Sequence, residues 1–311
     1  MPLAPRAGKA AREGAPSQKT SAAGKPEPLA EGGFVFHRLV PFVAALAALF
    51  VVQPAPAATP HRIVSLSPTA TESLFAIGAG AQVVAVDDQS DYPKRAPRTS
   101  LSGYTPNVEA IAGYRPDLVV LAGDANDVVA GLRKLGIRVL LQPAAKNLAD
   151  AYAEIRQLGA ITGHKKNAAA LVKRMQKAIA KAVKSVPKRR LSVYHELEPD
   201  LYSATSRTFI GKIYKLFGLR NIADAADSAG TGYPKLSAEY IVSANPDVIV
   251  LADTRCCGAT AASVAKRPGW SGIAAVQTGS VVGVDDSVAS RWGPRIVDFV
   301  RAIGKVLKRK R

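Results

Sequence analysis

Residues 166–186 decide the fold, and they read Lys166-Asn-Ala-Ala-Ala-Leu-Val-Lys-Arg-Met-Gln-Lys-Ala-Ile-Ala-Lys-Ala-Val-Lys-Ser-Val186. Apolar side chains recur at steps of three and four along this stretch, at Leu171, Met175, Ile179, Ala182 and Val186. That spacing places them on one stripe of an α-helix, while the intervening lysines face water. Pro187 cannot continue the helix. At about 1.5 Å per residue, the predicted helix is roughly 30 Å long, the diameter of a small domain.

The segment before this helix resembles the segment after it. The first reads Glu109-Ala-Ile-Ala-Gly-Tyr-Arg-Pro-Asp-Leu-Val-Val-Leu-Ala122, and the second reads Glu239-Tyr-Ile-Val-Ser-Ala-Asn-Pro-Asp-Val-Ile-Val-Leu-Ala252. Each copy predicts a short helix that begins with a glutamate, a Pro-Asp turn and a buried strand of the parallel type. Any two helix–turn–strand units can look alike, and this interpretation stays open.

The repeat favours an α/β fold of two similar lobes, each with a parallel-type sheet covered by helices. One long linking helix joins them. The length of 311 residues suits two domains. The predicted domains are a leader over 1–58, an N-terminal lobe over 59–163, the linking helix over 164–188 and a C-terminal lobe over 189–311.

The leader has the pattern of a secretory signal peptide. A basic flank at residues 37–38 precedes the apolar run 39–52, and small residues follow it. The segment ahead of the flank has few apolar side chains and cannot bury enough surface to become ordered. The run is short for a membrane span, although a retained anchoring helix is the alternative. We expect a start later than Met1, a mature chain from about Ala58 or Thr59, and a periplasmic location without a lipid anchor.

Lysine and arginine exceed aspartate and glutamate by 18. Such a balance can indicate nucleic acid or an anionic membrane as a partner. The sequence shows no recognition-helix motif, no aromatic–basic interleaving and no zinc-finger spacing, and the excess charge is spread along the chain. We therefore expect a solvated basic surface and no nucleic-acid partner.

No set of catalytic residues assembles from the sequence. The 4 histidines are scattered, and we find no Walker loop, no Gly-x-Ser-x-Gly elbow and no dinucleotide fingerprint after a strand. We therefore expect no enzyme activity and no metal site or cofactor belonging to the protein itself.

The candidate ligand-binding residues lie in loops. In parallel α/β sheets, ligands sit beyond the carboxyl ends of the strands, and the stretch 285–294 is predicted to be one such loop. Aromatic walls with a few polar groups suit a large, flat, partly apolar ligand. Each aromatic residue alone is more often a packing residue, but their concentration in loops favours contact with a ligand. The candidates are Ser67, Tyr92, Tyr104, Tyr202, Tyr233, Arg291 and Trp292.

Several segments together resemble a known family. They are His61-Arg-Ile-Val-Ser-Leu-Ser-Pro-Thr-Ala-Thr-Glu72, Ser90-Asp-Tyr-Pro93, Asn107-Val-Glu-Ala-Ile111, Arg115-Pro-Asp-Leu-Val119 and Gly293-Pro-Arg-Ile296. As a set they look like the helical-backbone periplasmic binding proteins, which are the substrate-binding components of ABC importers for vitamin B12, ferric siderophores and haem. The loop order resembles the vitamin B12 binders most.

The resemblance implies a ligand between the lobes and only a small closure around one helix. In this pattern Tyr202 and Tyr233 match aromatic ligand contacts, and Arg291 matches a polar one. Gln89 and Gly103 replace aromatic residues of the pattern, which keeps a ferric siderophore or a different corrinoid open as the ligand.

Glu109 and Glu239 match the two acidic residues, one on each lobe, that dock onto arginines of the membrane permease in this family. The internal repeat already pairs these two positions. Both glutamates would equally complement a helix dipole, and that alternative stays open.

Cys256 and Cys257 are adjacent, and they are the only cysteines of the chain. In an oxidising compartment they can form a disulfide with each other or between molecules. Free thiols, or a thiolate contact to the metal of a ligand, are the alternatives.

The predicted function is capture of a metal–organic chelate, first a corrinoid such as vitamin B12, and its delivery to the permease subunits of an ABC importer. A ferric-siderophore or haem binder is the alternative within the family. A two-lobed α/β enzyme acting on an anionic substrate through Asp87, Asp88 and Arg291 is the alternative from another class, although it lacks a nucleophile or cofactor. A sensor subunit of a signalling receptor is a third.

Overall fold

The computed structural model describes residues 58–309, and these residues belong to one compact unit. The predicted signal peptide therefore lies outside the described residues, apart from Ala58. Within residues 58–309, no helix combines the length and apolarity needed to cross a membrane.

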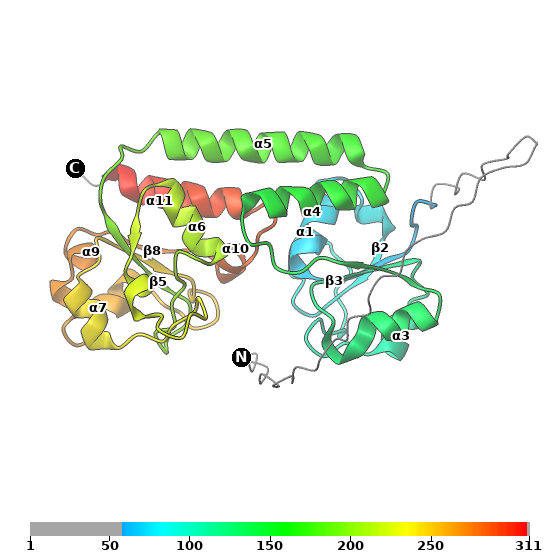
Figure 1. Cartoon of the computed structure of the whole chain (residues 1–311), viewed down its shortest axis with the longest axis horizontal. Helices are drawn as coiled ribbons and strands as arrows, with labels where there is room; N and C mark the ends of the chain where they lie inside the picture. Colours follow the sequence, from blue (N-terminus) through cyan, green and yellow to red (C-terminus); the bar gives the residue numbers. More distant parts are fainter. Residues whose placement is uncertain (1–57, 310–311) are drawn as a thin grey trace, which may run out of the picture. The chain divides into compact units, whose positions relative to one another are not determined.

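Two four-stranded sheets form the framework of this unit (Figure 1). The first has the order β2-β1-β3-β4, built from Ile63–Leu66 (β1), Val83–Val86 (β2), Leu118–Leu121 (β3) and Arg138–Leu141 (β4). The second has the order β6-β5-β7-β8, built from Ser192–Glu196 (β5), Arg220–Asn221 (β6), Val248–Leu251 (β7) and Val281–Gly283 (β8). All neighbouring strands in both sheets are parallel, so the predicted fold class is confirmed.

The internal repeat corresponds to one supersecondary unit in each sheet. Helix α2 (Val108–Ala112) leads into β3, and helix α7 (Ala238–Ala244) leads into β7. Asn107 and Ser237 cap the two helices by accepting hydrogen bonds from backbone N–H groups of the first turn. Both strands are buried along their whole length because helices cover both faces of a parallel sheet.

The remaining helices cover the sheets or join their strands. The longer ones are α1 (Pro68–Ala76), α3 (Val128–Lys134), α4 (Leu148–Ile161), α6 (Phe209–Leu216) and α11 (Ile296–Arg309). Short α-helices are α8 (Ala261–Ala265), α9 (Ala274–Gln277) and α10 (Asp286–Ser290), and 3₁₀ turns are η1 (Gly80–Gln82), η2 (Ala125–Asp127), η3 (Ile222–Ala226) and η4 (Trp270–Gly272).

The long helix α5 (Lys165–Lys184) lies between the two sheets in the chain order, close to the predicted bounds. It packs against α4, which follows the first sheet, and against α11, which follows the second (Figure 1). Leu171, Met175 and Ile179 are buried, as the apolar stripe predicts.

The connection between the halves is broader than a single helix. One hydrophobic core cluster contains Leu74 and Ile155 from the first half, Val172 from α5, and Phe299 from α11. The apolar face of α11 thus joins α5 in this shared core. The domain boundaries at residues 58, 163 and 188 stay predictions.

The prediction of a loop over 285–294 is wrong for its first part, because Asp286–Ser290 form helix α10. The Asp285 side chain accepts hydrogen bonds from the backbone N–H groups of Ser287 at 2.9 Å and Val288 at 3.3 Å. This side-chain cap satisfies donors at the start of a one-turn helix, which is too short to produce an apolar period.

Candidate ligand-binding cleft

Two adjacent cavities form a cleft beyond the carboxyl ends of the strands. The larger has a volume of about 620 Å³, and the smaller has a volume of about 330 Å³. Ser290 and Trp292 line both of them, so we treat them as the larger and smaller compartments of one cleft. Leu66 at the end of β1 and Asp87 just after β2 line the larger compartment, in the position expected for parallel α/β sheets.

Residues from both halves of the described chain line the larger compartment. Its walls include the start of α1, the loops after β2 and β3, the loop after β7, and α10 with the residues that follow it. Four of the predicted ligand-binding residues line it: Ser67, Tyr104, Arg291 and Trp292. Tyr104 is 80% exposed and free to contact a ligand, whereas Ser67 is buried and caps α1 by accepting from the N–H of Ala70.

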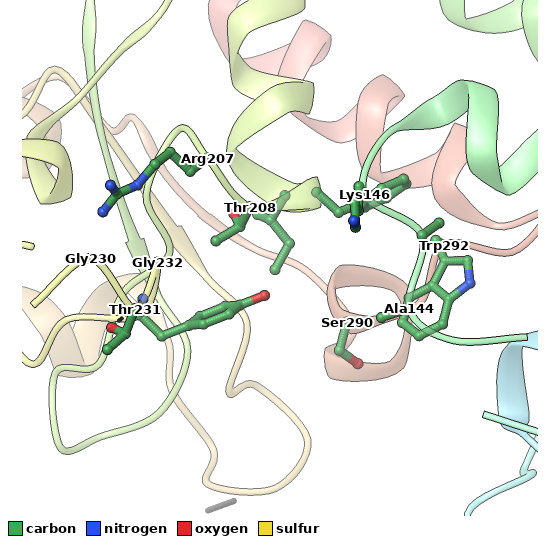
Figure 2. Close-up of a pocket in the computed structure, with 13 residues that line it drawn as sticks. Ala144, Lys146, Arg207, Thr208, Gly230, Thr231, Gly232, Ser290 and Trp292 are labelled. Carbon is green, nitrogen blue, oxygen red and sulfur yellow. Dashed lines mark hydrogen bonds between the residues drawn. The ribbon is translucent and has the colours of Figure 1, made fainter. Parts of the chain in front are cut away.

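The smaller compartment lies between the loop after β4 and two segments of the second half, the start of α6 and the loop 230–233. In Figure 2, Ala144, Lys146 and Trp292 lie on one side of the cavity, and Arg207, Thr231 and Gly232 lie on the other. Tyr233 also lines this cavity, as predicted for a ligand contact, and 49% of it is exposed.

Two other predicted aromatic residues lie elsewhere. Tyr92 lines a separate depression and stacks under Arg295, whose guanidinium carbon lies 4.4 Å from the ring centroid. Tyr202 lines neither compartment and lies beneath the Lys235 ammonium, 5.5 Å from its ring centroid. In the structure, each of these two rings therefore has a cation over its face. The predicted contact of Tyr92 and Tyr202 with a ligand stays a prediction.

Arg291 joins the two halves at the edge of the larger compartment. Its Nη1 donates to Glu72 Oε1 at 2.9 Å and to Asp91 Oδ1 at 2.8 Å, and its Nη2 donates to the carbonyl oxygen of Gln89 at 2.8 Å. Arg295 donates to both oxygens of Glu72. We call Glu72, Asp91, Arg291 and Arg295 the Glu72 cluster. The predicted ligand contact Arg291 thus lines the cleft with its charge already neutralised.

Arg255 adds a second connection across the cleft. Its Nη1 donates to Asp91 Oδ2 at 3.1 Å and to Asp285 Oδ2 at 3.3 Å. Partial burial alone would raise the pKa of Asp91, but hydrogen bonds and charge from Arg291, and then from Arg255, outweigh it and hold that pKa below its usual value. Both arginines of the larger compartment are therefore paired with carboxylates.

Trp292 has a fixed orientation because its indole Nε1 donates to Glu154 Oε2 at 2.7 Å. Burial raises the pKa of Glu154 to about 7, although the hydrogen bond from Trp292 opposes this shift. Glu154 lies on α4 in the first half of the chain. No pattern in the sequence predicts its hydrogen bond with Trp292.

Asp87 differs from Asp91, the half-buried acid that also follows β2, because no arginine among residues 58–309 donates a hydrogen bond to it. Asp87 is 1% exposed, and within the described part of the chain its Oδ1 has no hydrogen-bond partner. Burial raises its pKa to about 6. Gly103 lies directly beside it, since a Cβ at that position would stand 2.8 Å from the carbonyl oxygen of Leu66 and 3.0 Å from Asp87 Oδ2. Any side chain larger than that of glycine at position 103 would collide with this backbone.

The adjacent cysteines form a disulfide, which is the first of the three predicted alternatives. Cys256 lines the larger compartment. Asp286 holds this loop in place by accepting from the backbone N–H groups of Arg255 at 2.9 Å and Cys256 at 2.8 Å. Within residues 58–309, no group of three or more His, Cys, Asp or Glu residues could hold a metal ion.

Glu109 and Glu239 occupy equivalent places in the two halves. Each lies in the first turn of its helix, α2 or α7, with its side chain exposed. A hydrogen bond from its own backbone N–H, followed by one from the Ser237 side chain, lowers the pKa of Glu239. The pair thus presents one exposed acid on each half.

Comparison with known proteins gives consistent results. The family model described as periplasmic binding protein matches residues 63–288. An uncharacterized ABC transporter substrate-binding lipoprotein of Bacillus subtilis is 35% identical over 257 residues, which is 79% of this chain and 79% of that protein. A cobalamin-binding protein of Halobacterium salinarum is 35% identical over 249 residues, covering 77% of this chain and 67% of that protein.

Solved structures share the fold. The periplasmic vitamin B12 binding protein of Vibrio cholerae superposes with a TM-score of 0.67 at 25% sequence identity, covering 80% of this chain and 97% of that chain. The periplasmic haem-binding protein of the same organism superposes with a TM-score of 0.71 at 23% identity, covering 79% and 98%, and shows the fold alone. The chain belongs to the periplasmic binding protein family.

Proposed function

We propose that this chain is the substrate-binding protein of an ABC importer, that its leader exports it to the periplasm, and that it carries a corrinoid related to vitamin B12. The names of its relatives support this proposal: one is a cobalamin-binding protein at 35% identity, and another is a substrate-binding lipoprotein of an ABC transporter at 35% identity. The ligand would lie in the two-compartment cleft between the halves.

The charge of the larger compartment is the observation that favours a corrinoid over haem or a ferric catecholate. Asp87, Asp91 and Asp286 line it together with Arg255 and Arg291, and both arginines already donate to carboxylates. In the larger compartment, a haem with two propionates, or an anionic ferric catecholate, would find both arginines already paired and would meet the carboxyl group of Asp87. Burying a charge without a partner is costly. A corrinoid carries neutral carboxamides around its ring, and these can donate to carboxylate oxygens.

The same charges argue against an enzyme that uses Asp87, Asp88 and Arg291 on an anionic substrate. Such an enzyme needs Arg291 to be available for the substrate anion. Arg291 instead donates to Glu72, Asp91 and the Gln89 carbonyl.

Delivery to the permease would use the exposed pair Glu109 and Glu239. Each side chain projects from the first turn of a short helix in its own half, so the two could contact two arginines of a symmetric membrane partner. Exposed acids of this kind would set orientation and association rate more than affinity.

Tryptophan fluorescence offers a direct test, because the chain has 2 tryptophans in different environments. Trp292 lines both compartments, whereas Trp270 is buried in a separate core cluster of the second half. We expect cyanocobalamin to quench the fluorescence of the wild type and of Trp270→Phe, and to leave Trp292→Phe nearly unchanged. Haem and a ferric catecholate serve as competing ligands. Saturable binding of either of these, with none of cyanocobalamin, would refute the corrinoid assignment.

A further inference from the structure

A basic furrow lies between α5 and α11, outside the cleft. The two helices pack against each other, and residues of both line a cavity of about 510 Å³. We call this cavity the basic furrow. It shares no lining residue with either compartment of the cleft. Its lining contains no carboxylate but six cations, which are Arg174, Lys177 and Lys181 of α5 and Arg301, Lys305 and Lys308 of α11.

The apolar floor of the furrow consists of small residues. Ala178 and Ala182 of α5 are half-buried, and Gly304 of α11 is buried. A Cβ at Gly304 would stand 3.6 Å from the carbonyl oxygen of Ala182, so the two helices lie close together there. No large apolar side chain belongs to the lining. The walls are therefore the flexible stems of the basic side chains, whose charged ends reach water.

Most of these cations have no carboxylate to neutralise them. Within residues 58–309, five of the six form no salt bridge. Arg301 is the exception, because its Nη1 donates to Asp298 Oδ1 at 3.1 Å. All six side chains are exposed. Like charges at this spacing repel one another, and an anionic partner would remove that repulsion.

The positive charge continues beyond the furrow along the whole of α5. This helix has seven lysines and arginines, all of them exposed, and no aspartate or glutamate. Its 20 residues give a face about 30 Å long, at about 1.5 Å per residue. A face of this length with charge of one sign suits a partner that is itself broad and uniformly anionic.

We propose that the basic furrow and the exposed face of α5 form a contact surface for an anionic lipid bilayer. Headgroup phosphates would lie between the two rows of cations and accept hydrogen bonds from them. An acidic protein fits this surface less well, because protein interfaces concentrate their binding energy in large aromatic or arginine anchors and are depleted in lysine. The furrow instead has four lysines, and its apolar part is alanine and glycine.

This surface is distinct from the predicted permease-docking pair, Glu109 and Glu239. In Figure 1, α5 lies along one side of the described chain, and α7, which carries Glu239, lies on the opposite side of the second half. A chain that rests on lipid through α5 would therefore turn Glu239 away from that bilayer. The inference depends neither on the ligand of the cleft nor on the permease.

Co-sedimentation of the purified chain with lipid vesicles tests the proposal. We expect binding to vesicles of equal parts phosphatidylglycerol and phosphatidylcholine, and much weaker binding to phosphatidylcholine alone. Raising NaCl from about 0.1 M to about 1 M should abolish the binding, because the Debye length falls from about 10 Å to about 3 Å. A lysine near an anionic bilayer contributes about fivefold in affinity, so Lys177→Gln with Lys305→Gln should weaken binding roughly 30-fold.

Two matched double variants separate this surface from the net charge of the chain. Lys134→Gln with Lys266→Gln removes the same charge from exposed positions at the ends of α3 and α8, outside the furrow, and should leave vesicle binding nearly unchanged. Lys177→Arg with Lys305→Arg keeps both charges and should keep the binding.

Three results would overturn the proposal. The first is equal binding to both kinds of vesicle, and the second is equal weakening in the two glutamine double variants. The third is binding of soluble poly-L-glutamate without binding of the phosphatidylglycerol vesicles, which would assign the furrow to an acidic protein segment.

Discussion

Glu72 should stabilise the junction between the two halves by about 3 kcal/mol. It is 2% exposed and accepts hydrogen bonds from Arg291 Nη1 at 2.9 Å, Arg295 Nε at 3.0 Å and Arg295 Nη2 at 2.5 Å. Glu72→Gln keeps the shape but replaces one acceptor oxygen with an NH₂ group that faces arginine donors. A hydrogen bond to a charged group contributes about 1.5–3 kcal/mol, and breaking a buried ion pair costs about 3–5 kcal/mol.

For Glu72→Gln we expect a loss in the free energy of unfolding at the lower end of the range of about 3–5 kcal/mol for a broken buried ion pair. The reason is that Asp91 still neutralises Arg291 in the variant. Urea unfolding followed by circular dichroism measures the effect. A loss of about 3 kcal/mol should lower the midpoint by about 1 M, since the urea slope of a protein this size lies near the upper end of about 1–3 kcal/mol/M.

Asp298→Asn supplies the control for this measurement. Asp298 accepts from Arg301 at 3.1 Å, and both side chains of this pair are largely exposed. Its removal should change stability by less than about 1 kcal/mol. If Glu72→Gln and Asp298→Asn destabilise the protein equally, the Glu72 cluster does not stabilise the junction.

Three further predictions follow from single sites. Burial, with Glu196 as the second cause, raises the pKa of Asp253 from 3.8 to about 6, so its destabilising effect is absent below pH 3.8 and complete above pH 6. Asp253→Asn should therefore raise stability by about 3 kcal/mol in urea unfolding at pH 8 and change it little at pH 4. Unreduced protein should take up no alkylating label in mass spectrometry, and reduced protein should take up 2, because Cys256 and Cys257 are the only cysteines and form a disulfide. Glu109→Ala with Glu239→Ala should leave cyanocobalamin affinity unchanged and stop transport in cells, and a matching loss of affinity would refute their docking role.

Local patterns in the sequence predicted the architecture well. The apolar stripe of residues 166–186 and the Pro-Asp repeat depend on neighbours a few residues apart, and the structure has α5 at Lys165–Lys184 and equivalent units at α2–β3 and α7–β7. Helix α10 was missed because one turn held by a side-chain cap leaves no period to detect.

The contacts that build the cleft could not be predicted in the same way. Glu72 and Arg291 lie 219 residues apart, and Glu154 and Trp292 lie 138 residues apart. Nothing in the sequence near Arg291 indicates that carboxylates of the other half neutralise it. Whether Tyr92 faces a ligand or Arg295 likewise depends on the packing of a distant helix end.

The central claim is that the cleft carries a corrinoid without changing it. Equilibrium dialysis of the purified chain against cyanocobalamin, followed by release and chromatography of the bound ligand, tests this claim most directly. We predict one chemically unaltered molecule bound per chain, with no binding of haem under the same conditions. Absence of binding, or release of a modified corrinoid, would contradict the account.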